Sequence, residues 1–183
     1  TFGSFNNFRK INDEVINAWS KILKQVPNSK LILTPSDSAS LHLISEKFLK
    51  RGVLNSIKFQ SYKKDFDVHL NQYNKIDFAL DTFPYNGVTT SFESIWMGVP
   101  VLTIKGYNFI SRAGESINKN LGLDELISEN EDDYIEKAIS ISKDKNKILD
   151  LRKKVYDKAL ESPLFDKKKF CKEFFSSLEK IYN

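Results

Sequence analysis

Residues 80–93 read LDTFPYNGVTTSFE, and they leave a short apolar strand and enter a helix. Thr90 and Glu93 have the spacing of a capping box, with Thr90 predicted as the N-cap and Glu93 as the third helical residue. Asn86 and Gly87 are expected to form a turn with positive φ, which lets a ligand approach the backbone closely. The first amides of such a helix form an anion site, because their N–H groups and the helix dipole both favour negative charge.

A well-capped helix without any ligand has the same local pattern, and a capping glutamate needs no ligand. Residues 80–93 taken alone therefore leave two interpretations open, a phosphate-binding turn and an ordinary capped helix.

Outside this stretch, apolar runs bounded by Pro, Gly, Asn or Asp alternate with segments of helical periodicity. Such runs are typical of strands in a covered sheet. The predicted strands are Thr1–Asn6, Lys30–Thr34, Ser56–Gln60, Asp77–Leu80 and Val101–Ile104. The predicted helices between them cover about residues 12–26, 41–49, 65–74 and 90–97. A strand about every 20 to 30 residues, with a helix in each gap, predicts βαβ units and a Rossmann-like, doubly wound parallel sheet of the α/β class.

After residue 103 the pattern is helical, with helices predicted over about residues 111–121, 132–142, 145–160 and 166–182. We therefore expect one domain over residues 1–183, with a Rossmann-like core over about 1–105 and a helical extension over about 106–183. Ligands of such a sheet bind beyond the carboxyl ends of the strands. Because the pattern opens directly on a strand at Thr1, we also expect a longer polypeptide.

The composition indicates a globular domain, because 14 Phe and 7 Tyr can fill a core. No apolar run approaches the ~18 residues of a membrane helix, and no signal-peptide pattern is present at the start. The net charge is +4, carried by lysines spread along the chain, so we expect neither a membrane nor a nucleic-acid partner. The single cysteine, Cys171, excludes an internal disulfide, is expected to be packed and fits a cytoplasmic location.

Two other kinds of site are disfavoured. Asp65 and Asp67 spell a D-x-D metal–diphosphate motif, but they open a predicted helix where Asp65 is expected as the N-cap, so we predict no metal site. A dinucleotide-binding oxidoreductase needs G-x-G-x-x-G after the first strand, where Gly3 stands alone.

Residues 81–103 read DTFPYNGVTTSFESIWMGVPVLT, and they resemble the donor-site segment of glycosyltransferase family 41. That family holds the O-linked N-acetylglucosamine transferases and the SPINDLY-type proteins. The shared pattern is L-D-T, two or three residues, N-G/A-x-T-T, an acidic residue three positions on, and W-x-G-x-P-V-L-T. Further similar segments follow in the same order over essentially the whole chain: FNNFRKI at 5–11, WSKILKQVPNS at 19–29, SR at 111–112 and SPLF at 162–165.

The resemblance implies a role for each matching residue. Thr89 and Thr90 would bind the donor diphosphate through hydroxyl and amide groups, and Glu93 would hold the ribose hydroxyls. Lys10 would be the catalytic residue that neutralises the β-phosphate of the leaving group.

Two further residues match the nucleotide site of the family, and one departs from it. Asn7 would face the diphosphate, and His69 would line the nucleotide pocket. Val88 stands where many members have a histidine before the Thr-Thr pair, which leaves the identity of the donor open.

The resemblance further implies the C-terminal, donor-binding half of an inverting GT-B glycosyltransferase without a cofactor or metal. It would transfer a sugar to a Ser or Thr hydroxyl of a protein acceptor, and the sugar implied first is GlcNAc, donated by UDP-GlcNAc. An N-terminal GT-B domain, preceded by tetratricopeptide repeats, would complete the enzyme, so residues 1–183 alone are expected to be inactive. A fucosyl or glucosyl transferase of the same fold, including one with a GDP-sugar donor, and a non-catalytic interaction module remain alternatives.

Overall fold

A computed structural model describes residues 1–35 and 37–182. It contains six short strands: β1 (Phe2–Ser4), β2 (Leu31–Leu33), β3 (Ile57–Phe59), β4 (Phe78–Leu80), β5 (Val101–Ile104) and β6 (Ile127–Ser128). The α-helices are α1 (Asp13–Gln25), α2 (Ser38–Lys50), α3 (Phe66–Leu70), α4 (Thr89–Trp96), α5 (Ala113–Asn120), α6 (Glu131–Ser142), α7 (Lys145–Glu161) and α8 (Lys167–Tyr182). Short 3₁₀ helices are η1 (Phe8–Lys10), η2 (Leu54–Ser56), η3 (Asn71–Lys75) and η4 (Asp124–Leu126).

All strands run parallel, in the order β3-β2-β1-β4-β5-β6. This is the strand order of a doubly wound Rossmann-like sheet and confirms the predicted fold class. The strand order reverses between β1 and β4, which are neighbours in the sheet. The loops that follow these two strands therefore lie side by side at the switch point, where such sheets bind ligands.

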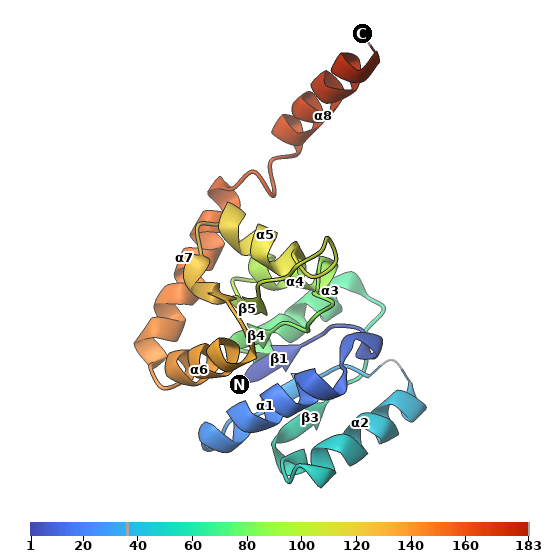
Figure 1. Cartoon of the computed structure of the whole chain (residues 1–183), viewed down its shortest axis with the longest axis vertical. Coiled ribbons are helices and arrows are strands. Elements are labelled where there is room, and N and C mark those ends of the chain that lie inside the picture. The colour runs from blue at the N-terminus through green and yellow to red at the C-terminus, as the bar shows by residue number, and fades with distance from the viewer. Residues whose placement is uncertain (36, 183) are drawn as a thin grey trace.

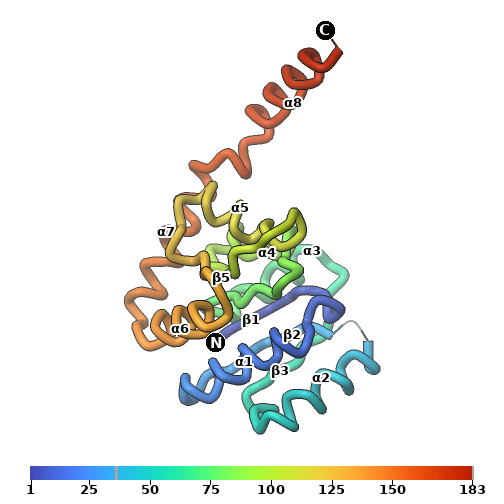
Figure 2. Tube along the Cα trace, in the orientation of Figure 1, coloured from blue at the N-terminus to red at the C-terminus, as the bar shows by residue number. Residues whose placement is uncertain are grey.

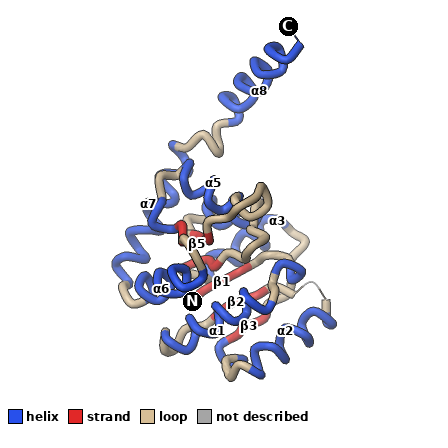
Figure 3. Tube along the Cα trace, viewed as in Figure 1, coloured by secondary structure: helices blue, strands red, loops and turns tan. Residues whose placement is uncertain are grey.

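Helices cover both faces of the sheet (Figures 1 and 3). Right-handed crossovers place α1 and α2 on one face and α4 and α5 on the other. Helix α6 packs against α1, and α7 contacts both α4 and α6. Among the described residues, no helix is long and apolar enough to cross a bilayer.

The interior contact between α1 and α6 also reaches the end of β4. Trp19, which is fully buried, donates from Nε1 to the Tyr134 hydroxyl at 3.1 Å. Tyr134 donates in turn to the Asp81 carbonyl oxygen at 2.9 Å. The buried face of α1 therefore fixes the position of the turn after β4, and the Asn12 side chain caps this helix by accepting from the Val15 amide.

One strand was not predicted. Strand β6 pairs with β5 inside the segment expected to be helical. Two residues are too few to give the periodicity from which strands are recognised. Helices α5 and α6 contact β5, so residues beyond 105 complete the sheet and its cover.

Helix α8 projects away from the rest of the chain (Figures 1 and 2). It has no buried residue, and Cys171 on this helix is exposed. The expectation that Cys171 is packed is therefore wrong, because the rest of the described chain buries no residue of the helix that carries it.

Candidate active site at the switch point

The loop after β1 delivers a lysine to the turn after β4. The Lys10 ammonium donates to the Asn86 carbonyl oxygen at 2.8 Å and lies 4.1 Å from the centre of the Tyr85 ring. Burial lowers the pKa of Lys10 below its ordinary value, and the charge of Asp81 opposes this change. The cation is thus held at the turn by a carbonyl group and an aromatic face, two partners that do not neutralise its charge.

The N-terminus of α4 begins beside this lysine. Its N-cap position is Val88, which cannot cap by a side chain, and the first helical bond joins the Phe92 amide to the Val88 carbonyl oxygen. The amides of Thr89, Thr90 and Ser91 therefore have no hydrogen-bond partner within the described chain. Such free amides are the donors from which anion sites are built.

The predicted capping box does not form. Thr90 is the second residue of α4, and its hydroxyl donates to Asn6 Oδ1 at 2.7 Å. Glu93 directs its carboxylate to Tyr73 and His69 instead of the helix start. The interpretation as an ordinary capped helix therefore fails for this element, whereas Asp65 does cap α3 as expected.

The role expected of Gly87 is also corrected. Its φ is not positive, so the turn does not need glycine for that reason. A Cβ atom at this position would lie 2.6 Å from Thr90 Oγ1 and 2.7 Å from Asn6 Oδ1. Glycine is required here because the turn passes directly against the Asn6–Thr90 hydrogen bond.

The Asp81 side chain holds the turn after β4 in position through four hydrogen bonds. Its fully buried carboxylate accepts from the amides of Thr82 at 2.8 Å and Gly87 at 2.7 Å. It also accepts from Thr103 Oγ1 at 3.0 Å and from Asn6 Nδ2 at 3.3 Å. Burial raises the pKa of Asp81 to about 6, although these hydrogen bonds act in the opposite direction.

Asp81 therefore connects β4, β5 and the loop after β1 through one group. In the sequence, Asp81 is distinguished only as the start of the family motif. A carboxylate at the end of a buried strand, inside a stretch rich in hydroxyl and amide side chains, is the signal that could have identified it.

A second cluster lies on the other flank of α4. Glu93 Oε2 accepts from the Tyr73 hydroxyl at 2.8 Å and is 3.0 Å from His69 Nε2. Burial, followed by the neighbouring Glu93 carboxylate, raises the pKa of Tyr73 far above its ordinary value. The His69 and Glu93 side chains keep 15% and 17% of their surface exposed, so a ligand can still reach them. The structure thus brings two of the predicted residues together, and Tyr73 was not predicted.

Asn7 has a local role in this structure. It precedes η1, and its Oδ1 accepts from the Arg9 amide at 3.0 Å. The side chain is exposed at the same loop that carries Lys10. Its predicted position near a diphosphate stays a prediction.

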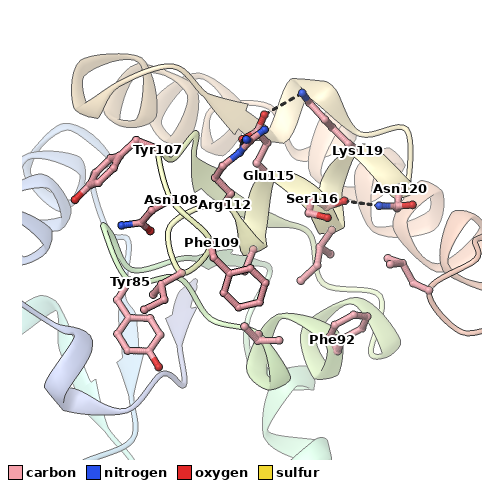
Figure 4. Close-up of a pocket in the computed structure, with 15 residues that line it drawn as sticks. Tyr85, Phe92, Tyr107, Asn108, Phe109, Arg112, Glu115, Ser116, Lys119 and Asn120 are labelled. Carbon is pink, nitrogen blue, oxygen red and sulfur yellow. Dashed lines mark hydrogen bonds and ion pairs between the residues drawn. The ribbon is translucent and has the colours of Figure 1, made fainter. Parts of the chain in front are cut away.

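A cavity of about 860 Å³ lies between α4 and α5, and Figure 4 shows side chains that line it. Tyr85 and Val88 line it, together with the exposed loop 107–110, whereas Lys10, Thr89 and Glu93 do not. On the α5 side, the buried Glu115 carboxylate pairs with two cations, Arg112 at 3.2 Å and Lys119 at 2.9 Å. Val88 therefore gives an apolar wall to the space beside the anion site.

Comparisons with known proteins identify the family of this chain. The family model described as "Glycosyl transferase family 41" matches residues 1–174. A tomato (Solanum lycopersicum) protein named probable UDP-N-acetylglucosamine–peptide N-acetylglucosaminyltransferase SPINDLY is 35% identical over all of this chain, which spans 20% of that protein. A Caenorhabditis elegans UDP-N-acetylglucosamine–peptide N-acetylglucosaminyltransferase is 29% identical over 99% of this chain and 16% of its own length. The chain thus spans about a fifth of the curated relatives it matches.

Solved structures show the same fold. The Thermobaculum terrenum O-GlcNAc transferase mutant K341M superposes with a TM-score of 0.92 and 33% identity, over 99% of this chain and 35% of that one. The lipopolysaccharide glycosyltransferase WaaG shares the fold alone, at 16% identity and a TM-score of 0.68. These neighbours are GT-B glycosyltransferases. With its family match over nearly the whole length, this chain belongs to glycosyltransferase family 41.

Proposed function

We propose that this chain is the donor-binding half of an inverting transferase that moves GlcNAc from UDP-GlcNAc to a Ser or Thr hydroxyl of a protein. The observation that supports this most directly is the convergence of the Lys10 ammonium and three unpartnered α4 amides on one turn. An ammonium group and free amides together match the charge and the acceptor oxygens of a diphosphate.

The proposed reaction breaks the bond between the sugar C1 atom and the β-phosphate oxygen. The acceptor hydroxyl oxygen forms the new bond to C1, its proton passes to a base outside residues 1–183, and the nucleoside diphosphate leaves. Negative charge develops on the β-phosphate oxygen as the old bond breaks. Lys10 and the α4 amides are already oriented toward that charge, which is electrostatic stabilisation of the transition state.

The proposed part of Thr90 takes account of its hydrogen bond to Asn6. Its hydroxyl proton is donated to Asn6, so we expect the Thr90 amide to be the donor to phosphate. The hydrogen bond to Asn6 would then hold the start of α4 in position. Thr89, whose side chain is exposed, keeps both its hydroxyl and its amide available.

Glu93 is proposed to bind the ribose hydroxyls, with His69 beside it in the nucleotide pocket. The two side chains lie 3.0 Å apart, and neither lines the cavity that Val88 lines. A nucleotide seated this way would place its ribose near Glu93, its diphosphate at Lys10 and its sugar toward Tyr85.

The relatives named above are described by a UDP-N-acetylglucosamine donor, which favours UDP-GlcNAc for this chain. Val88, which lines the cavity, stands where many family members have a histidine, so the donor pocket can differ from theirs. A GDP-sugar is therefore the second candidate donor. Calorimetric titration of UDP and GDP into the protein decides between them. Binding of GDP but not UDP would overturn the UDP-GlcNAc assignment.

If the chain is instead a non-catalytic interaction module that only retains the fold, it should not bind a nucleotide. A nucleotide at ~100 times its Kd should instead stabilise the chain by about 2.7 kcal/mol, which raises Tm by about 5–10 °C for a protein of this size. An unchanged Tm with both UDP and GDP would favour the module.

A further inference from the structure

The cavity between α4 and α5 is lined mainly by apolar side chains, among them Phe92, Phe109, Ile117 and Leu164. At about 860 Å³ it is as large as the pockets that hold a drug-sized ligand. The diphosphate and the sugar of the proposed donor are polar. The greater part of this cavity therefore matches a different, apolar ligand.

Two aromatic side chains of the loop 107–110 lie in water at the edge of this cavity (Figure 4). Tyr107 is 81% exposed and Phe109 is 95% exposed. Ser111 fixes the base of the loop, because its Oγ accepts from the Tyr107 and Asn108 amides, both at 3.0 Å, and its amide donates to Asn108 Oδ1 at 3.0 Å. Apolar side chains that a fixed loop holds in water beside a cavity indicate a binding surface.

The cavity begins at the turn where the proposed transfer takes place. Tyr85 lines the cavity, and the centre of its ring is 4.1 Å from Lys10 Nζ. The first turn of α5 adjoins the same turn, since the Gly114 amide donates to Asn86 Oδ1 at 3.2 Å. A chain that brings a hydroxyl group to the sugar at this turn therefore passes the opening of the cavity.

The length of the cavity matches a short piece of extended polypeptide. Ala113 and Asn120, at the two ends of α5, both line the cavity, so it follows the helix for about 10 Å. In an extended chain every second side chain points to the same side, and such neighbours lie about 7 Å apart. When an acceptor hydroxyl points to the transfer point, the side chain two residues away thus points to the same side and reaches the cavity.

We propose that this cavity binds a large apolar side chain of the protein acceptor, such as Leu, Ile or Phe, two residues from the Ser or Thr that receives the sugar. The buried Glu115 carboxylate at the cavity is already paired with Arg112 and Lys119, so it does not oppose an apolar ligand. The inference rests on the proposed function, because it requires that the acceptor hydroxyl comes to the turn at Lys10.

Synthetic acceptor peptides test this inference with the full-length protein and UDP-GlcNAc. Each peptide carries one Ser among Ala and Gly residues, and a single Leu replaces Ala two residues before or two residues after the Ser. In one of these two positions Leu should raise kcat/KM for transfer about 10- to 50-fold over the Ala peptide, because its side chain leaves water. A peptide with Leu five residues from the Ser is the control and should react like the Ala peptide.

Ser116→Phe tests whether the cavity is the source of this preference. Ser116 is exposed on α5 and lines the cavity, so a phenyl ring there fills part of it. The preference for Leu should fall to within about twofold, whereas Kd for UDP and the hydrolysis of UDP-GlcNAc without peptide should not change. Ser140→Phe on the exposed side of α6 is the matched control and should keep the preference. Phe109→Ala, at a side chain whose exposure makes it dispensable for folding, should also lower the preference.

The outcomes separate this inference from the proposed function. A protein that binds UDP and transfers GlcNAc but treats the Leu and Ala peptides alike would overturn the inference and leave the function intact. A preference for Leu that persists in both Ser116→Phe and Phe109→Ala would overturn it as well. Equal rates for all peptides, together with a lower Tm of full-length Ser116→Phe, would indicate that another part of the polypeptide fills the cavity, which contradicts the inference. Absence of both UDP binding and transfer would overturn the function and the inference together.

Discussion

Replacing Lys10 with alanine removes the ammonium group that joins the loop after β1 to the turn after β4. The variant loses one charged hydrogen bond to the Asn86 carbonyl oxygen and the contact with the Tyr85 ring. If the site is correctly assigned, it also loses the cation that faces the β-phosphate. The substitution therefore acts on stability and on binding by amounts that can be compared.

The stability loss should be modest. The Lys10 side chain is only partly buried, and water can replace it at the Asn86 carbonyl, so the net cost is about 1 kcal/mol. For a chain of 183 residues this lowers Tm by about 2–4 °C. A charged hydrogen bond to the diphosphate is worth about 1.5–3 kcal/mol, so Kd for UDP should rise about 10- to 150-fold.

The assay is isothermal calorimetry with UDP, beside thermal melts of the same samples. Lys24→Ala is the matched control, because Lys24 is exposed on α1 and takes part in no ion pair among the described residues. Tyr85→Phe is a second control that keeps the aromatic face beside Lys10 and should bind nearly as the parent does.

The reasoning is refuted if Lys10→Ala binds UDP within about twofold of the parent, since a loss of 1.4 kcal/mol already changes Kd tenfold. A variant that melts far lower than expected and also binds weakly would be uninformative about the phosphate, so Kd is measured well below Tm. Lys10→Arg retains the charge and should recover part of the affinity, but not all, because the planar guanidinium cannot replace a compact ammonium group.

Glu93→Gln keeps an acceptor for the Tyr73 hydroxyl but loses the negative charge, so Kd for UDP, measured by calorimetry, should rise about tenfold while Tm changes little. An unchanged Kd would show that Glu93 does not bind the ribose. Thr90→Val leaves Asn6 Oδ1 without its donor, which should lower the free energy of unfolding in urea by about 1–3 kcal/mol, whereas Thr90→Ser should not. Because the folded-state pKa of Asp81 is raised to about 6, the stability that protonated Asp81 contributes is complete below the unfolded pKa and is lost as pH rises through about 6. Thermal melts from pH 4 to 8 should therefore show the free energy of unfolding of the parent falling by on the order of 2–3 kcal/mol. The Asp81→Asn variant should not show this fall. Excess EDTA should leave Kd for UDP unchanged, since Lys10 and the α4 amides supply the positive charge in the proposed site.

Much of the fold follows from local pattern. All five predicted strands are present, and the order of helices between them is correct. The helix over about residues 12–26 was predictable because Val15, Ile16 and Trp19 recur at helical spacing, and these side chains are buried. Strand β6 was missed because two residues carry no periodicity.

The candidate site was only partly predictable. The positions of Lys10 and of Thr89 were expected at the ends of their strands, and the parallel sheet does bring those two ends together. The contribution of Asp81, which holds the turn, was not foreseen. Its four donors come from three separate segments of the chain, and no short motif contains them all.

The sequence by itself determined the family, the alternation of strands and helices, and the residues that stand after each strand, because these depend on neighbours within a few positions. Only the tertiary structure decided which hydrogen bonds those residues make. Thr90 and Glu93 have the spacing of a capping box, yet Thr90 bonds to Asn6, 84 positions away, and Glu93 bonds to Tyr73 on a different element. A buried polar group takes the partner that folding places within 3 Å or so, and that choice is made by packing between distant segments rather than by local spacing.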